Sequence, residues 1–211
     1  MIVIYTCILS ENIETNRIFD VAKKMPPSRY QEFLNVDSQS AKIQKVIAYL
    51  LLRKALEDVE IDHGNLDFSY TVHGKPYFRE LPIEFSISHS NEIVAVVLDQ
   101  TEVGLDVEKL REVNPRLVNK VFSLKERKKF SNHLLDKNIF CKAWTIKESY
   151  TKCLGEGLYV DFSTLSFDLS KDINCINNLY INSFKIRDYY VSVCSRQIEY
   201  QIKYIKIQEL L

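Results

Sequence analysis

KERKKF at residues 125–130 and KNIFCKAWTIKESYTKCL at residues 137–154 are separated by a short polar gap. Apolar residues of the longer stretch recur at spacings of three and four, which predicts a helix. A similar order occurs earlier in the chain, where SRYQEF at residues 28–33 precedes KIQKVIAYLLLRKAL at residues 42–56. A short helix followed by a long helix therefore occurs twice, which predicts that the chain is built from two related halves.

Runs of β-branched and aromatic residues around these helices predict strands. We expect strands at residues 2–9, 66–71, 83–88, 93–98, 103–108, 164–168, 180–187, 189–194 and 200–205. We expect helices at residues 14–24, 28–34, 40–56, 115–121, 124–133 and 137–154, with Ser28 as the cap of the second. The predicted fold class is α+β, in two similar α+β halves, 1–100 and 101–211, with the boundary near Gln100–Thr101. The seam between the halves is the expected place for a ligand cleft.

The charge balance limits the classes of partner. The chain has 28 Lys and Arg residues and 28 Asp and Glu residues, so its formal net charge is zero. A neutral total argues against bulk binding to nucleic acid or to an acidic membrane. With 46% hydrophobic and 27% charged residues, the composition is typical of a folded soluble protein.

Cysteine usage and the N-terminal sequence indicate the compartment. There are five cysteines, an odd number, and no CxxC pattern, which fits a reducing cytosol. The N-terminal stretch MIVIYTCILSENIE lacks a basic region, and its apolar run is too short for a signal peptide or a spanning helix. We therefore expect a cytoplasmic protein.

The strand expected at residues 103–108 carries acidic side chains on one face. Val103, Leu105 and Val107 alternate with Gly104, Asp106 and Glu108, so the second set shares a face. Two neighbouring carboxylates are unfavourable unless water or a cation lies between them. A glycine on the same face lets another group approach closely. A solvated acidic face on an edge strand would give the same pattern.

The helix expected at residues 137–154 has two stripes. Its apolar stripe consists of Ile139, Ala143, Ile146, Tyr150 and Cys153, and the opposite face carries Trp144, Glu148 and Lys152. An ordinary surface helix has no reason to expose the only tryptophan of the chain, so we expect the other half to cover this face. The alternative is a solvent-exposed Glu–Lys pair that contributes only a few tenths of a kcal/mol.

Three further features suit phosphate or an acidic partner. FSISHS at residues 85–90 ends a strand with hydroxyls and an imidazole, which are good phosphate donors. Gly74-Lys75-Pro76 places a lysine in a stiff turn. The basic residues near the second pair of short helices are Lys120, Lys125, Arg127, Lys128 and Lys129. Each feature also has an ordinary interpretation, as a polar strand end, a turn and a solvated helix face.

Other chemistries lack their motifs. His63, His73, His89 and His133 form neither HxxxH nor HExxH, which argues against a zinc site. The sequence contains no GxSxG, no P-loop and no GxGxxG pattern.

Four motifs, in order, resemble the 4′-phosphopantetheinyl transferases. VGLDVEK at residues 103–109 is similar to the family's (V/I)G(I/V)D(I/V)E signature, and WTIKESYTK at residues 144–152 to its W-(S/T)-x-K-E-(S/A)-x-x-K signature. HGKPYF at residues 73–78 and FSISHS at residues 85–90 resemble the upstream motifs. The length and the double layout resemble the Sfp type, a monomeric pseudo-dimer whose halves are related by a pseudo-twofold axis with the active site at the seam. The resemblance covers roughly residues 25–160.

The resemblance implies transfer of 4′-phosphopantetheine from coenzyme A to a serine of an acyl or peptidyl carrier protein, with release of 3′,5′-ADP. Asp106, Glu108 and Glu148 would bind Mg²⁺, with Mn²⁺ as a substitute, and Asp106 would act with the catalytic pair Glu148 and Lys152. Mg²⁺ takes few carboxylates and favours phosphate oxygens. Glu148 or a metal-bound water would take the serine proton, and Lys152 would contact the phosphates and assist departure of the nucleotide.

The resemblance also assigns the grip on coenzyme A to the first half and the metal and catalytic motifs to the second. Lys75, Ser88 and His89 would hold the phosphates. The usual basic cluster of the first half is altered here, with Gln44 where an arginine is common, so Arg29, Lys45 or Lys42 would substitute.

The expected partner is an acidic carrier protein that binds transiently, through the basic helices near Lys125–Lys129 and the apolar residues of Val113–Phe122. No nucleic acid or membrane partner is expected. Two alternatives stay open: a non-catalytic module that binds coenzyme A or a carrier protein, and another metal-dependent enzyme that cleaves phosphodiesters.

Overall fold

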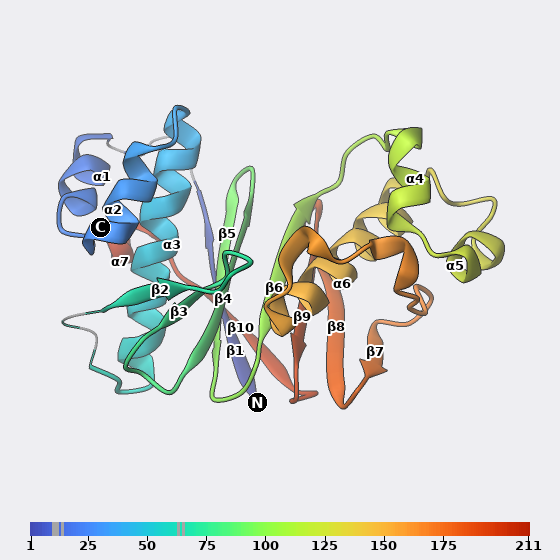
Figure 1. Cartoon of the computed structure of the whole chain (residues 1–211). Helices are drawn as coiled ribbons and strands as arrows, with labels where there is room; N and C mark the ends of the chain where they lie inside the picture. Colours follow the sequence, from blue (N-terminus) through green and yellow to red (C-terminus); the bar gives the residue numbers. More distant parts are fainter. Residues whose placement is uncertain (10–12, 14, 63, 65) are drawn as a thin grey trace.

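A computed structural model describes residues 1–9, 13, 15–62, 64 and 66–211 of the chain (Figure 1). The strands are β1 (Ile2–Ile8), β2 (Phe68–Tyr70), β3 (Pro76–Phe78), β4 (Glu84–Ser90), β5 (Ile93–Asp99), β6 (Gly104–Lys109), β7 (Ile173–Ile176), β8 (Leu179–Ile186), β9 (Tyr189–Ser195) and β10 (Tyr200–Tyr204). The helices are α1 (Thr15–Ala22), α2 (Pro27–Leu34), α3 (Gln39–Asp58), α4 (Pro115–Val121), α5 (Leu124–Lys129), α6 (Lys137–Leu154) and α7 (Ile207–Leu210), with 3₁₀ turns η1 (Gly157–Tyr159) and η2 (Phe162–Thr164). The predicted α+β class is confirmed. None of the helices in these ranges is both long and apolar enough to cross a membrane.

Two four-stranded sheets form the centre of the molecule, with the orders β10-β1-β5-β4 and β6-β9-β8-β7, and β2 and β3 form a separate hairpin. The long helix α3 packs on the first sheet and α6 on the second, so that helices flank the sheets on both sides (Figure 1). In each half the first strand pairs with the last strand of a hairpin, β1 with β5 and β6 with β9. A strand, three helices and a hairpin whose last strand pairs with that first strand therefore follow one another twice along the chain.

The two sheets share an apolar core. Ile4 of β1 and Val97 of β5 are fully buried and belong to the same cluster as Leu105 of β6 and Val193 of β9. Separate clusters lie beneath α3 in the first half and beneath α6 in the second. Because the apolar face of β6 is used here, its other face, with Asp106 and Glu108, is free to contribute to the seam.

Serine hydroxyls join the edges of the two sheets. Strands β4 and β6 run side by side, and Ser86, Ser88 and Ser90 each accept a hydrogen bond from a backbone N–H of β6 through Oγ. The donors are the N–H groups of Leu105, Val107 and Lys109, at 2.9, 3.1 and 3.1 Å. The side chains thus take the place of a backbone ladder and satisfy donors that would otherwise be buried and unpaired.

Close packing of α6 on β6 requires Gly104. A Cβ at this position would lie 1.9 Å from the backbone oxygen of Ser149 and 2.4 Å from the backbone nitrogen of Cys153, so no other residue fits. The expected close approach at this glycine is confirmed, and the approaching group is the backbone of α6. This contact brings the face of α6 that carries Glu148 next to the acidic face of β6.

Several local expectations were wrong. No strand forms at residues 164–168, because Lys147 Nζ binds the carbonyls of Phe162 and Leu165, and the N–H of Phe167 donates to Glu126. Helix α5 ends at Lys129 rather than at residue 133. Helix α2 begins at Pro27, with Pro26 as its cap in place of Ser28, because proline suits the first turn. The helix expected from residue 14 starts at Thr15, and residue 14 lies outside the described residues.

The final strand leaves the half to which the sequence assigned it. Residues 200–205 were expected to complete the half 101–211, but β10 pairs in parallel with β1, with Ile2 opposite Tyr200 and Ile4 opposite Ile202. Helix α7 then packs against α3. The chain end therefore ties the first half to the second, since β10 pairs with the edge of β1 that β5 does not occupy.

Candidate functional site

A cavity of about 350 Å³ lies at the seam between the halves. Its lining includes every predicted site residue except Lys75, namely Arg29, Lys45, Ser88, His89, Asp106, Glu108, Glu148 and Lys152. These side chains come from α2, α3, β4, β6 and α6, so both halves contribute to one site. Trp144 also lines this cavity and packs against Phe140 and Phe162, at ring-centroid distances of 6.3 and 5.6 Å.

Asp106 lies at the centre of the polar contacts in the cavity. Its Oδ1 accepts hydrogen bonds from Lys152 Nζ at 2.6 Å and from Ser88 Oγ at 3.0 Å. Burial raises the pKa of Asp106 despite the opposing effect of Lys152 and Ser88. One carboxylate is thus held almost out of solvent, with a single cation beside it.

The neighbouring carboxylates add negative charge that Arg111 and Lys152 offset only in part. Burial and then the charge of Asp106 raise the pKa of Glu108, whose Oε2 accepts from Ser90 Oγ at 3.3 Å. Burial, followed by the charge of Asp106, raises the pKa of Glu148 from 4.5 to about 7. Three carboxylates that each resist ionisation line one cavity, and a bound cation would relieve their repulsion.

The donor set fits a hard divalent cation. Asp106 Oδ2 is buried and has no hydrogen-bond partner among the described residues, so one carboxylate oxygen remains available as a ligand. Asp106, Glu108 and Glu148 supply only oxygen donors, which Mg²⁺ prefers. Within the described ranges, no group of three or more His, Cys, Asp or Glu side chains is arranged as a metal site. The ammonium of Lys152 instead neutralises Asp106.

Two cations of the first half lie at another part of the same cavity. Arg29 on α2 is buried and Lys45 on α3 is half-buried, and both bind Glu32 of α2. His89 of β4 is close enough to Lys45 and to Lys152 that both, after burial, lower its pKa. His89 is therefore near one cation of each half, Lys45 and Lys152, in the same cavity. Glu32 was not expected from the sequence, although its spacing of three residues from Arg29 on one helix was a usable signal.

Lys75 lies apart from the other predicted phosphate ligands. Its Nζ contacts Glu84 Oε2 at 3.0 Å and the carbonyls of Val103 and Cys153 at 3.3 and 3.5 Å. The residue lines a second cavity of about 550 Å³, together with His73, Phe85 and Tyr159. Both cavities include Glu148 and Lys152 in their linings, so they adjoin at the face of α6 that carries these two residues.

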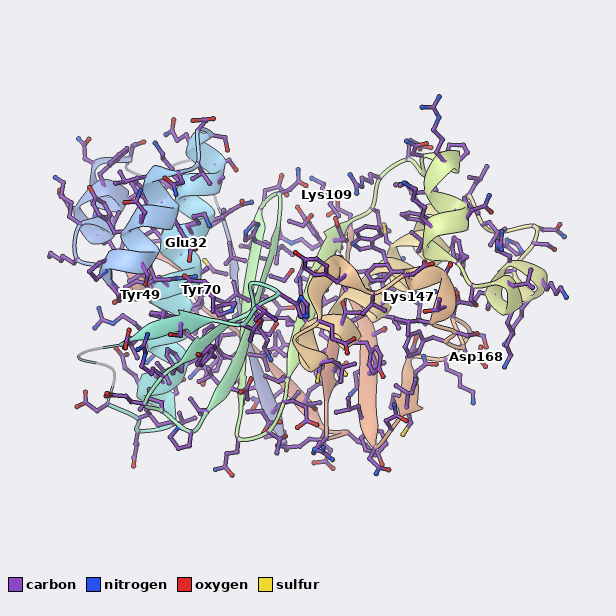
Figure 2. The ribbon with its side chains drawn as sticks, in the orientation of Figure 1. Glu32, Tyr49, Tyr70, Lys109, Lys147 and Asp168 are labelled. Carbon is purple, nitrogen blue, oxygen red and sulfur yellow. The ribbon has the colours of Figure 1, made fainter. Side chains whose placement is uncertain are left out.

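A buried ion pair fixes the segment of α6 next to the site. The side chains of Lys147 and Glu126 are 0% and 1% exposed, with Nζ and Oε2 2.6 Å apart. Lys147 Nζ also binds the carbonyls of Val121, Phe162 and Leu165 at 2.6, 3.1 and 2.8 Å. Figure 2 shows Lys147 inside the second half. The residue before Glu148 thus anchors the end of α4, helix α5 and the segment at η2 to α6.

Comparison with known proteins agrees with these features. The family model described as "4′-phosphopantetheinyl transferase superfamily" matches residues 102–202, which include Asp106, Glu108, Glu148 and Lys152. The 4′-phosphopantetheinyl transferase gsp of Aneurinibacillus migulanus is 29% identical over 153 residues, which are 70% of this chain and 63% of that protein.

Two further relatives extend the comparison. The 4′-phosphopantetheinyl transferase Sfp of Bacillus subtilis (strain 168) is 29% identical over 168 residues, covering 72% of this chain and 74% of that protein. The L-aminoadipate-semialdehyde dehydrogenase-phosphopantetheinyl transferase of Candida glabrata is 30% identical over 141 residues, covering 62% of this chain and 54% of that protein. The chain is therefore similar to the 4′-phosphopantetheinyl transferase superfamily over residues 102–202, and its similarity to gsp and Sfp favours the Sfp type.

Proposed function

We propose that this chain transfers the 4′-phosphopantetheine group from coenzyme A to a serine of an acyl or peptidyl carrier protein and releases 3′,5′-ADP. The observation that carries the proposal is one cavity that combines three carboxylates and Lys152 from the second half with Arg29, Lys45 and Glu32 from the first. The pyrophosphate of coenzyme A suits the carboxylates and Lys152 through a divalent cation, and the adenosine end of the molecule would extend towards the group from the first half. The names of the relatives support the same activity.

Asp106, Glu108 and Glu148 would hold Mg²⁺, and their oxygen-only donor set would also accept Mn²⁺. When bound, the metal would neutralise negative charge on the pyrophosphate. Lys152, at 2.6 Å from Asp106, lies within reach of the same phosphates. Ser88 and His89, on the adjoining edge of β4, would donate to phosphate oxygens, while Lys75 would act from the second cavity.

The reaction forms one P–O bond and breaks another. The carrier serine oxygen attacks the phosphorus atom that bears the pantetheine arm, and the bond from that phosphorus to the oxygen of the nucleotide phosphate breaks. Glu148, which lines the cavity beside Asp106, takes the serine proton, with a cavity water as the alternative acceptor. The Lys152 ammonium offsets the negative charge that develops on the departing 3′,5′-ADP.

A single copy of the chain can form this site, because all its residues come from the two halves of one polypeptide, which supports a monomer.

An acidic carrier would contact the basic helices α4 and α5. Lys120, Lys125 and Lys128 are exposed there, whereas Lys129 is paired with Asp168. We assign the grip on coenzyme A to residues 1–100 and the metal and catalytic groups to residues 101–211. The five free cysteines support a location in the cytoplasm.

Intact mass spectrometry tests this proposal. A panel of apo carrier proteins is incubated with the chain, coenzyme A and Mg²⁺, and at least one carrier should gain the mass of one phosphopantetheine group. Binding of coenzyme A without transfer to any carrier would favour a non-catalytic module, and release of free phosphopantetheine without a carrier would favour a phosphodiesterase.

The substitution Glu148→Gln tests the assignment of the site. It should lower turnover by at least about a hundredfold, because it removes a proton acceptor and a metal ligand while keeping the shape of the side chain. Glu156→Gln, in an exposed residue just past the end of α6, is the matched control and should leave turnover unchanged. Normal turnover by a folded Glu148→Gln variant would show that the site is assigned wrongly.

A further inference from the structure

Glu32 lies within the group of cations that the first half contributes to the cavity. Arg29 Nη1 donates to Glu32 Oε1 at 2.9 Å and to Oε2 at 3.1 Å, and Lys45 Nζ donates to Oε2 at 3.2 Å. The Tyr70 hydroxyl also donates to Oε1, and both residues lie in the first half (Figure 2). One carboxylate therefore accepts from both cations and from a phenol, which is how a bound phosphate monoester would be held.

Arg29 is built as an anion-binding residue. Its side chain is 7% exposed, and its guanidinium lies over the ring of Phe68, 5.2 Å from the ring centroid. Its Nε is buried and has no hydrogen-bond partner in the described part of the chain. A buried guanidinium that lines a cavity and keeps an unused donor suits an oxyanion with more acceptors than a single carboxylate.

The charge count decides how strongly such an anion binds. Arg29 and Lys45 contribute two positive charges and Glu32 one negative charge, which leaves a net charge of plus one. A phosphate monoester carries about −1.5 to −2 at neutral pH, so it would meet the Glu32 carboxylate at short range. Like charges in a half-buried site repel more strongly than in water.

We propose that Glu32 is a specificity-determining residue that occupies the place of the 3′-phosphate of coenzyme A between Arg29 and Lys45. The inference rests on the proposed function, because it takes coenzyme A as the substrate. The pyrophosphate would lie by Lys152 and the carboxylates of the second half, whereas Arg29, Lys45 and Glu32 come from α2 and α3 of the first half. The 3′-phosphate then contributes little binding energy. The chain therefore accepts both coenzyme A and 3′-dephospho-coenzyme A as substrates and binds the two with similar affinities.

Isothermal titration calorimetry with the two ligands tests the inference on the full chain in the presence of Mg²⁺. The wild-type chain should bind coenzyme A less than about tenfold more tightly than 3′-dephospho-coenzyme A. Glu32→Gln should bind coenzyme A about tenfold more tightly than wild type does. Its affinity for 3′-dephospho-coenzyme A should be unchanged, because only coenzyme A places a phosphate beside residue 32.

Two variants serve as controls. Glu80→Gln removes an exposed carboxylate that is not in the lining of the seam cavity and should leave both affinities unchanged. Adding Lys45→Gln to Glu32→Gln should reverse the gain for coenzyme A, since the freed cation is then lost.

The outcomes separate this inference from the proposed function. If neither ligand binds the wild-type chain, both are wrong. If both ligands bind, the inference alone is wrong when wild type prefers coenzyme A by more than about tenfold. It is also wrong when folded Glu32→Gln leaves the ratio of the two affinities unchanged. The wild-type ratio provides the test even if the variant does not fold.

Discussion

Lys152 Nζ lies 2.6 Å from Asp106 Oδ1, so a cation of the chain itself neutralises the most buried carboxylate of the site. The same Nζ lies 3.4 Å from Ser88 Oγ, which in turn donates to Asp106. One lysine of α6, one serine of β4 and one aspartate of β6 thus connect the two halves at the place where the phosphates are proposed to bind.

This contact predicts opposite effects of Lys152→Met on catalysis and on metal binding. Turnover should fall by about a hundredfold or more, because a charge that stabilises the leaving nucleotide is lost. Affinity for Mg²⁺ should rise a few-fold, because Asp106 loses its internal cation. Carrier modification and metal titration by calorimetry measure the two effects. A parallel loss of metal affinity would contradict the competition between Lys152 and the metal.

Ser88 and Ser86 form a matched pair for the hydroxyl contacts between β4 and β6. Each substitution to alanine leaves a buried N–H of β6 without its acceptor and should lower the free energy of unfolding by about 1–3 kcal/mol. Only Ser88 also binds Asp106. Urea unfolding should therefore show similar losses, while carrier modification should be slower in Ser88→Ala than in Ser86→Ala. Equal activities would show that the Ser88–Asp106 contact is dispensable.

Lys147 and Glu126 predict a large cost when their pair is broken. Lys147→Met leaves a buried carboxylate unpaired and should lower the free energy of unfolding by about 3–5 kcal/mol. Lys129→Met breaks the half-exposed pair with Asp168 and should cost less than about 1 kcal/mol. Denaturant unfolding of both variants measures the contrast. Similar losses would mean that burial does not determine the contribution of the Lys147 pair.

Asp58 predicts part of the dependence of stability on pH. Burial raises its pKa, but hydrogen bonds from Lys203, Lys54 and Tyr5 outweigh burial and lower the pKa from 3.8 to about 2. A depressed pKa stabilises the folded chain at pH values above the unfolded pKa, and the contribution is lost as the pH falls through the folded pKa. The stabilising effect of Asp58 should therefore be complete above about pH 5 and be lost progressively as the pH falls to about 1.

The substitution Asp58→Asn isolates this effect. At pH 6 the free energy of unfolding of the variant should be lower than that of wild type by about 1–2 kcal/mol, a figure reduced because solvent screens the half-exposed Lys203. The difference between the two free energies should shrink from pH 4 towards pH 2. Denaturant unfolding at each pH measures the difference. A constant difference over that range would show that Asp58 does not titrate as described.

The sequence alone determined the elements and faces that depend on local pattern. Helices α4 and α6 have the predicted bounds. The alternation along residues 103–108 placed Asp106 and Glu108 on one face, because side chains of a strand alternate regardless of context. The helical spacing of Trp144, Glu148 and Lys152 predicted a second covered face for the same reason.

Only the tertiary structure decided which of these residues meet. Nothing local indicates that β10 pairs with β1, that serines of β4 accept from β6, or that Lys75 binds Glu84 in a different cavity from Ser88. Glu32 looked like an ordinary surface residue of a short helix until the fold placed Lys45 and Tyr70 against it. Pattern fixes the direction of a side chain within its own element, whereas partners distant in sequence are selected by how sheets and helices pack to bury their apolar faces.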